Sequence, residues 1–156
     1  MFAMDTLEFD EWEKSVPDDL KADTIWRLPA YRLSLYLCSA AQSDLQRIVQ
    51  HRATRALGDQ LLRSVGGISA SIDEGYSRSS GVERAHFYEY ALGSAREARG
   101  WYWKCSIALP AALVAARIAM LTRIIRILTA IIPRERALGT AWRRKRDASV
   151  GTSNPQ

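Results

Sequence analysis

The feature that most constrains this chain of 156 residues is an apolar stripe with the period of an α-helix. Between positions 87 and 105, apolar or small residues recur at steps of four and three, which places them on one face of a helix. The stripe consists of Phe87, Ala91, Ser94, Ala98, Trp101 and Cys105. Heptad-like steps favour long antiparallel helices that cross at shallow angles. The stripe therefore predicts a helical fold.

The same period predicts four amphipathic helices joined by short connections. We expect them from about residue 20 or 23 to 41, and over residues 44–76, 80–105 and 110–132, with Pro133 ending the last helix. No segment longer than a few residues alternates with the period of two that a half-buried strand requires. The predicted fold class is all-α, an up-down-up-down four-helix bundle.

A proline, a serine and two glycines add detail to the prediction of the first two helices. Pro29 lies inside the first pattern, where it cannot donate a backbone hydrogen bond, so we expect a kink or a helix whose regular part begins there. Ser43 is a good N-cap for the second helix. Gly66 and Gly67 lie within that helix, and each costs about 1 kcal/mol relative to alanine. The two glycines therefore favour a close approach by another helix.

The predicted fourth helix is apolar on two sides. One side includes Leu121 and Ile125 and is expected to face the bundle core, and the other includes Ile124 and Ile127. A helix that is apolar on two sides is buried on two sides, so the second side needs another chain. We therefore expect a homo-oligomer with Ile124 and Ile127 in its interface.

The two ends of the chain carry opposite charge, although the net charge is +5. Residues 1–22 hold seven acidic and two basic side chains, and residues 133–156 hold six basic and two acidic ones. We therefore divide the chain into an acidic arm (1–22), a helical bundle (23–132) and a basic tail (133–156). The arm is either a flexible recognition segment or a strap packed on the body of the chain. The two ends either bind different partners or pair with each other.

Arginine dominates the basic residues, with 18 among the 22 lysines and arginines. Arginine suits bidentate contacts with the phosphates of RNA or DNA, although a high-GC genome also produces arginine-rich chains. Trp142 stands beside four consecutive basic residues, where its ring is placed to stack on an exposed base. The residues predicted to contact nucleic acid are Arg117, Arg123, Arg126, Arg134, Arg136, Trp142, Arg143, Arg144, Lys145 and Arg146.

Patterns for catalysis and metal binding are sparse. Glu83 and His86 form one Glu-x-x-His pair, whereas a di-metal bundle site needs two such pairs and two further glutamates. Asp73 and Glu74 are neighbours on a helix, so their side chains point about 100° apart and do not form an acid–base pair. No phosphate-binding loop, dinucleotide fingerprint or nucleophile elbow is present. We therefore predict no enzyme activity, no cofactor and no metal.

Three features bear on location. Cys38 and Cys105 stand in apolar surroundings without metal-ligand spacing, which favours free thiols in a cytosolic protein. The N-terminus is acidic, whereas a signal peptide begins with a basic region and an apolar core. The apolar stretch 108–132 contains three arginines, each of which is costly at mid-bilayer. We expect a cytoplasmic protein without membrane contact.

The segment 60–78 contains the most specific motif of the chain and reads QLLRSVGGISASIDEGYSR. It resembles the hallmark of the bacterial four-helix-bundle family of 23S rRNA intervening-sequence proteins, approximately QLRRAxxSIPANIAEGYGR. The matching positions are Gln60, Arg63, Ile68, Ala70, Ile72, Glu74, Gly75, Tyr76 and Arg78. Weaker similarities lie at 25–31 and 87–97, so the resemblance covers about residues 23–132. The family's SIPAN is GISAS here, which marks a divergent member.

The resemblance implies a homopentameric barrel of four-helix bundles. The same fold is used by the accessory variability determinant of diversity-generating retroelements, a basic protein that binds a reverse transcriptase and nucleic acid. Our leading hypothesis is therefore a non-enzymatic nucleic-acid-binding accessory protein, the partner of a reverse transcriptase. The alternative is a structural or regulatory adaptor that binds protein and not nucleic acid. In either case we expect structural roles for Glu74, Gly75 and Arg78, with Gly75 allowing the helix to end or turn.

Overall fold

The computed structural model describes the backbone of residues 3–151 and the side chains of residues 8–139. Its helices are α1 (Ala3–Ser15), α2 (Asp18–Ala22), α3 (Pro29–Gln50), α4 (Gly58–Tyr76), α5 (Gly81–Lys104) and α6 (Ala111–Gly151). Short 3-10 turns lie in the connections: η1 (Thr24–Arg27), η2 (Arg55–Leu57) and η3 (Ser106–Ala108). Residues 3–151 contain no strand, so the prediction of an all-helical fold is confirmed. None of the helices in this range has the length and apolarity needed to cross a membrane.

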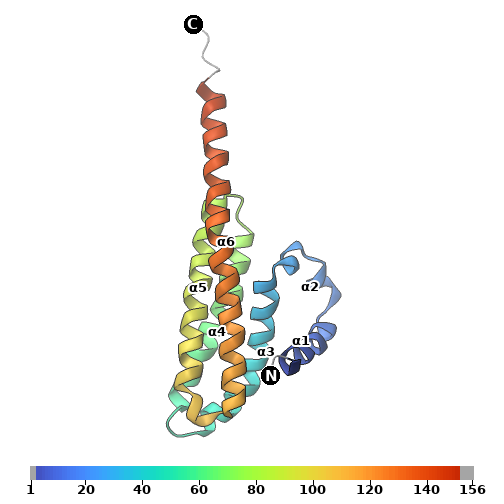
Figure 1. Cartoon of the computed structure of the whole chain (residues 1–156), viewed down its shortest axis with the longest axis vertical. Coiled ribbons are helices and arrows are strands. Elements are labelled where there is room, and N and C mark those ends of the chain that lie inside the picture. The colour runs from blue at the N-terminus through green and yellow to red at the C-terminus, as the bar shows by residue number, and fades with distance from the viewer. Residues whose placement is uncertain (1–2, 152–156) are drawn as a thin grey trace.

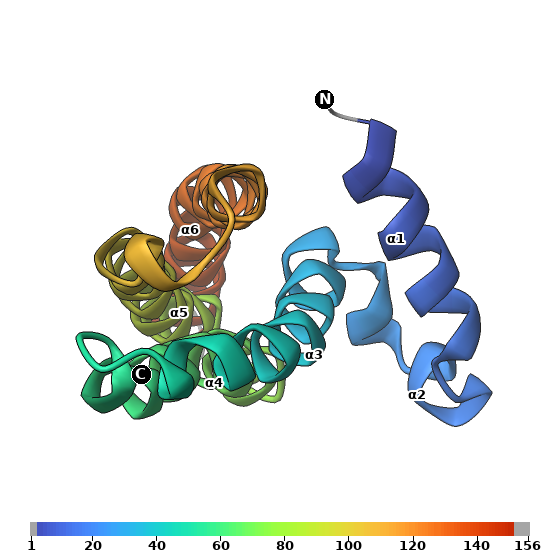
Figure 2. The same cartoon turned by 90° about the horizontal axis from the view of Figure 1, so that it is seen from below.

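The four long helices, α3 to α6, pack side by side around one apolar core (Figures 1 and 2). α4 contacts both α3 and α5, and α6 contacts both α5 and α3. α5 and α6 run antiparallel, because Gly81 at the start of α5 lies against Gly139, whereas Arg99 near its end donates to Thr122. Fully buried aliphatic side chains in this core include Leu37, Ile48, Leu61, Ile68, Ile72, Leu121, Ile124 and Leu128.

Sequence signals locate the starts of three long helices. Pro29 is the first residue of α3, so the second of its two predicted alternatives, a helix that begins there, is confirmed. The first turn of a helix has no intrahelical acceptor for its N–H groups, so proline costs nothing there. Pro110 immediately precedes α6, and its carbonyl accepts a bond from the Val114 N–H at 3.1 Å. Ser80 precedes α5 as predicted, but its side chain makes no capping bond.

The predicted boundary between the first two long helices is wrong, because α3 continues through Asp44. This residue is not at a helix start but buried in the middle of α3, where it accepts hydrogen bonds from Tyr102 and Arg117. The connection to α4 lies further along the chain, where the Thr54 hydroxyl donates to the Ile48 carbonyl at 2.8 Å. In the sequence, Ser43 and Asp44 resemble the start of a helix. They lie within a continuous helix, where Asp44 has buried hydrogen-bond partners.

The prediction that Pro133 ends the last helix is also wrong, because α6 continues through it. A proline inside a helix removes a backbone bond and costs about 3 kcal/mol. The turns beyond it pack on the start of α5: Gly81 lies against the α6 backbone near Gly139, and Arg84 pairs with Glu135 at 2.8 Å. These contacts hold the part of α6 beyond the proline against α5. The last part of α6 projects past the ends of the other helices (Figure 1).

One glycine of the predicted pair serves a close helix contact. A Cβ at Gly67 would lie 2.9 Å from the Ser94 Oγ on α5, so a larger residue there would require the Ser94 hydroxyl to move aside. A Cβ at Gly66 would meet no neighbour within 4 Å. The predicted role in close packing therefore applies to Gly67 and not to Gly66.

The acidic N-terminal segment lies against the body of the chain as α1. The Trp12 Nε1 donates to the Ser39 Oγ at 3.2 Å, and Arg32 donates to Glu13 at 2.8 Å. The Trp12 ring also meets the Tyr36 ring with their centroids 5.5 Å apart. Figure 2 shows α1 and α2 on the side of α3 that faces away from α5. Of the two alternatives for this segment, the structure shows the packed strap.

The predicted oligomer residues occupy different environments. Ile124 is fully buried inside the single chain, which corrects its assignment to a subunit interface. The physical reason is that α6 packs against both α3 and α5, so two of its sides are covered without a second copy. Ile127 is half-buried, and Leu121 and Ile125 are buried in the core as expected.

Candidate nucleic-acid interface

Arg117 is predicted from sequence to contact nucleic acid, and the structure contradicts this. The residue is only 6% exposed, and its Nε donates to the Asp44 Oδ2 at 2.9 Å. The Tyr102 hydroxyl donates to the same oxygen at 2.9 Å. Burial alone would lower the pKa of Arg117, but the hydrogen bond and negative charge of Asp44 outweigh burial and raise it. Arg117 is therefore a charged core residue whose guanidinium neutralises a buried carboxylate.

Two other predicted arginines of α6 lie on one exposed face of the helix. Arg123 and Arg134 are exposed, and exposed Ala130 lies between them at helical spacing. Both arginines are therefore accessible to solvent. This face is distinct from the side of α6 that meets α5.

Arg126 and Arg136 lie on the side of α6 that adjoins α5. Two contacts define this side: Arg136 donates to Glu89 at 2.7 Å, and Arg99 donates to Thr122 at 3.2 Å. At about 100° per residue, Arg126 lies about 40° from Thr122 on one side and Arg136 lies about 40° from it on the other, so the two arginines flank this contact. Both Arg126 and Arg136 are exposed. The boundary between α5 and α6 is therefore lined with guanidinium groups from both helices.

The adjoining face of α5 is exposed along its length. Its members recur at steps of four and three, and all are exposed: Glu89, Gly93, Arg96, Gly100 and Trp103. A Cβ at Gly93 or Gly100 would meet no neighbour within 4 Å. Each glycine costs about 1 kcal/mol relative to alanine inside a helix, and no close contact within the described residues requires either of them. The strip thus keeps open backbone between its charged side chains.

We call the exposed boundary between α5 and α6 the arginine seam. It is defined by Arg96 and Arg99 of α5 and by Arg126 and Arg136 of α6. Arg99 is half-buried, and the other three are exposed. The acidic residue Glu89 adjoins the seam and pairs with Arg136. The positive charge of the seam exceeds its negative charge, and arginine binds phosphate through paired N–H donors. Such a strip is suited to a polyanion.

Sequence reasoning selected Arg126 and Arg136 but missed Arg96, Arg99 and Trp103. The signal was present, because these α5 residues lie outside the apolar stripe of the same helix and share their face with two glycines. Trp103 is 68% exposed, a high value for such a large apolar ring. The pairing of α5 with α6, which brings the two sets of arginines together, could not be read from either helix alone.

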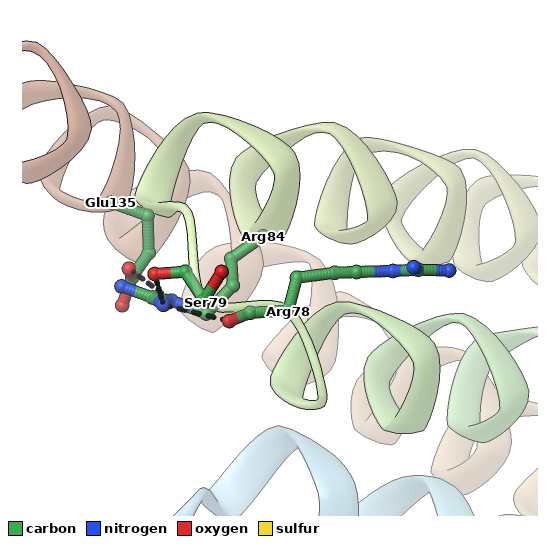
Figure 3. Close-up of polar contacts among 4 residues, drawn as sticks. All are labelled: Arg78, Ser79, Arg84 and Glu135. Atoms are coloured by element: carbon green, nitrogen blue, oxygen red, sulfur yellow. Dashed lines mark hydrogen bonds and ion pairs between the residues drawn. The ribbon is translucent and has the colours of Figure 1, made fainter. Parts of the chain in front are cut away.

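The turn between α4 and α5 fixes one end of the seam (Figure 3). The Arg84 Nε donates to Glu135 at 2.8 Å, and its Nη1 donates to the carbonyls of Arg78 and Ser79 at 2.9 and 3.1 Å. In Figure 3 the Arg78 side chain points away from this group. Burial, reinforced by the charge of Glu135, raises the pKa of Tyr88 to about 12. One guanidinium therefore ties the turn, α5 and α6 together.

The motif residues at this turn make local contacts. Arg78 pairs with Glu74 one helical turn before it, and its guanidinium carbon lies 5.0 Å from the centre of the Phe87 ring. A Cβ at Gly75 would lie 2.9 Å from both Phe87 and Tyr88. Gly75 lies inside α4, so its small size matters for the approach of α5 and not for a turn. This corrects the expected reason for the glycine.

Five predicted contact residues lie outside the described side chains. They are Trp142, Arg143, Arg144, Lys145 and Arg146. The structure gives their backbone as part of α6, so their proposed contacts with nucleic acid stay predictions.

The described residues contain no group of three or more histidine, cysteine, aspartate or glutamate side chains arranged to hold a metal ion. Cys38 is half-buried, Cys105 is buried, and both are free thiols. Burial raises the pKa of each thiol, which disfavours the reactive thiolate.

Over the described residues, the fold is all-helical and the seam is an exposed strip lined with arginines. The model of the family described as 23S rRNA-intervening sequence protein matches residues 27–109, more than half of the chain. The chain belongs to this family, which confirms the resemblance seen in segment 60–78. No curated protein and no solved structure matches the chain.

Proposed function

We propose that this chain is a non-enzymatic nucleic-acid-binding accessory protein that holds the phosphate backbone along its arginine seam. The observation that carries the proposal is the exposed strip itself, where Arg99 of α5 donates to Thr122 of α6 at 3.2 Å and Arg136 of α6 donates to Glu89 of α5 at 2.7 Å. Phosphate contacts of this kind are largely independent of sequence and weaken as salt rises. The family description refers to 23S rRNA, which agrees with an RNA-related role.

The proposed working form is a cytoplasmic homo-oligomer, a pentameric barrel of up-down-up-down four-helix bundles. Its support is the apolar surface that remains on α6, where Ile127 is half-buried and Leu138 is 61% exposed. Several seams in one assembly would bind one nucleic acid with higher avidity than a single seam. The proposed protein partner is the reverse transcriptase of a diversity-generating retroelement, as the family resemblance suggests.

A second candidate is a structural or regulatory adaptor that binds another protein. The observation that favours it is an exposed apolar pair near the connection of α5 and α6, where Trp103 and Ile107 are both 68% exposed. Large exposed apolar side chains close to one another in sequence are typical of protein contact surfaces. This candidate requires no binding of nucleic acid by the seam.

The double variant Arg96→Ala/Arg126→Ala tests the seam. We expect weaker binding to RNA and DNA of every sequence, because fewer phosphates are neutralised. The slope of log affinity against log salt should become less steep by about one for each phosphate that the variant no longer binds. Fluorescence anisotropy over a range of salt concentrations measures both quantities. The matched control is Arg123→Ala/Arg134→Ala, which removes the same charge from the other exposed face of α6.

A seam variant with the affinity and salt slope of the wild type would contradict the proposal. If the control alone weakened binding, the interface would lie on the face of Arg123 and Arg134. A wild-type protein that binds neither RNA nor DNA at low salt would leave the adaptor as the better function. Size-exclusion chromatography of each variant shows whether the assembly is intact in these comparisons.

A further inference from the structure

An aromatic cluster stands at one end of the seam, on the outer side of α5. The His86 and Tyr90 rings meet edge to face with their centroids 4.6 Å apart. The Phe87 ring lies 6.2 Å from His86 and 6.0 Å from Tyr90. The Arg78 guanidinium carbon lies over the Phe87 ring, 5.0 Å from its centroid. We call the three rings, together with the Arg78 guanidinium, the ring cluster.

The ring cluster is held in place by the packing of α4 on α5, and two of its rings are exposed to solvent. Phe87 is half-buried and its Cβ lies against Gly75, so it is fixed in the contact between α4 and α5. Tyr90 is 54% exposed, and the side chain of His86 is 60% exposed. Exposed rings held at fixed angles lose little conformational freedom when another ring stacks on them. The cluster is therefore a prepared surface for a flat ligand.

Both arginines beside the cluster are paired with carboxylates. Arg78 pairs with Glu74, and Arg136 pairs with Glu89 at 2.7 Å. A ligand that stacks on the cluster consequently gains ring contacts without adding phosphate contacts. This separates the cluster chemically from the seam, where Arg96 and Arg126 are exposed.

The cluster adjoins the seam through one residue. Glu89 bonds to Arg136 of the seam, and its other oxygen lies 3.9 Å from the His86 Nδ1. A strand whose phosphates follow the seam past Glu89 thus reaches the rings of His86 and Tyr90 with its next bases. Bases are available for such stacking only where the strand is unpaired.

We propose that the ring cluster binds unpaired bases of a single-stranded nucleic acid, one base stacking on Tyr90 and another on His86, because the two rings are inclined by 62°. The inference rests on the proposed function, because the seam must first hold the backbone. It adds a preference that the seam lacks: single strands over duplexes. Arginine contacts to phosphate do not distinguish the two forms in this way, whereas stacking requires a base outside the helix.

Tyr90→Ala and His86→Ala test the cluster in the full-length protein. The probes are a short labelled single-stranded RNA without self-complementarity and the blunt duplex formed by that RNA. We expect each variant to bind the single strand about tenfold more weakly, since stacking on an aromatic side chain stabilises single-strand complexes to this degree. Binding of the duplex and both salt slopes stay at the wild-type values. Tyr90→Phe keeps the ring and is expected to bind as the wild type does.

Each outcome decides the proposal. Unchanged single-strand binding by both alanine variants would overturn it, and the seam would still be supported if Arg96→Ala/Arg126→Ala weakened binding. Equal losses for single strand and duplex, or a changed salt slope, would also overturn it, because they indicate a charge or folding effect. Thermal unfolding checks the fold of each variant, and Tyr90→Leu provides an apolar ring-free replacement if the alanine variant unfolds early. A wild type without nucleic-acid binding would end both proposals, and capture of a peptide by the cluster would then favour the adaptor.

Discussion

Two arginines on the same helix show how differently one residue type behaves inside and outside this fold. Arg117 of α6 is buried and shares the carboxylate of Asp44 with Tyr102. Arg126, further along α6, is exposed at the seam with α5. Both are equally basic in the sequence, but only the second is accessible to a phosphate. The packing of α6 against α3 makes this distinction.

The comparison separates stability from binding. An exposed arginine contributes little to stability, because water and salt screen its interactions. A buried arginine that balances a buried carboxylate cannot be removed without leaving that carboxylate unpaired. We therefore expect changes inside the fold to act on unfolding and changes at the seam to act on binding.

Arg117→Ala is expected to have the largest effect on stability. It leaves Asp44 buried without its cationic partner, and breaking a buried pair in this way typically costs about 3–5 kcal/mol. Chemical denaturation monitored by circular dichroism measures the loss. Arg126→Ala is the matched control, since an exposed arginine on the same helix should change the unfolding free energy by less than about 0.5 kcal/mol.

Similar unfolding free energies for Arg117→Ala and Arg126→Ala would contradict the distinction between the two arginines. The double variant Asp44→Asn/Arg117→Ala sharpens the comparison. If the unpaired carboxylate is the cause, removal of its charge should recover part of the lost stability.

Gly81→Ala is expected to have the next largest effect. A Cβ at this position would overlap the Glu135 carbonyl oxygen and approach the Gly139 nitrogen to 3.0 Å. Both are backbone atoms that cannot move aside alone, so the two helices must separate locally. Overpacking of this kind costs about 1–3 kcal/mol. A thermal unfolding midpoint equal to that of the wild type would show that α6 does not pack on α5 beyond Pro133.

Local signals predicted much of the helical framework. Pro29 and Pro110 mark where helices begin, because proline acts within one turn of its own position. Ser80 also precedes a helix, although its side chain makes no capping bond. The errors at Asp44 and Pro133 have a different origin. Each residue interrupts a helix pattern locally. Asp44 has a buried partner in Arg117, and the helix beyond Pro133 is held against α5 by the pair of Arg84 and Glu135. Distant compensation is not visible in a local pattern.

The candidate site was predictable to a smaller extent. Arginine content and helical spacing suggested a basic surface and selected Arg126 and Arg136. They did not separate these from buried Arg117, because its partner Asp44 lies on another helix. The ring cluster depends on rings from neighbouring turns of α5 and on Arg78 across the α4–α5 contact. Its geometry follows from the packing of two helices.

Gly93→Ala is expected to have the smallest effect on stability, and of opposite sign. The new Cβ enters open space, and alanine is favoured over glycine inside a helix by about 1 kcal/mol. The variant should therefore unfold at a higher temperature than the wild type, in contrast to Gly81→Ala. The two glycines begin and line the same helix, so the pair compares a packed position with an open one directly.

The same variant tests why the seam keeps an open glycine at all. If a nucleic-acid backbone lies against α5 between Glu89 and Arg96, the added methyl group of Gly93→Ala should weaken binding of single strands and duplexes alike. The salt slope should stay unchanged, because no charge is removed. A variant that is more stable and binds as tightly as the wild type would remove Gly93 from the interface. The guanidinium groups of the seam would then bind phosphate from the tips of their side chains, with the α5 backbone out of reach of the ligand.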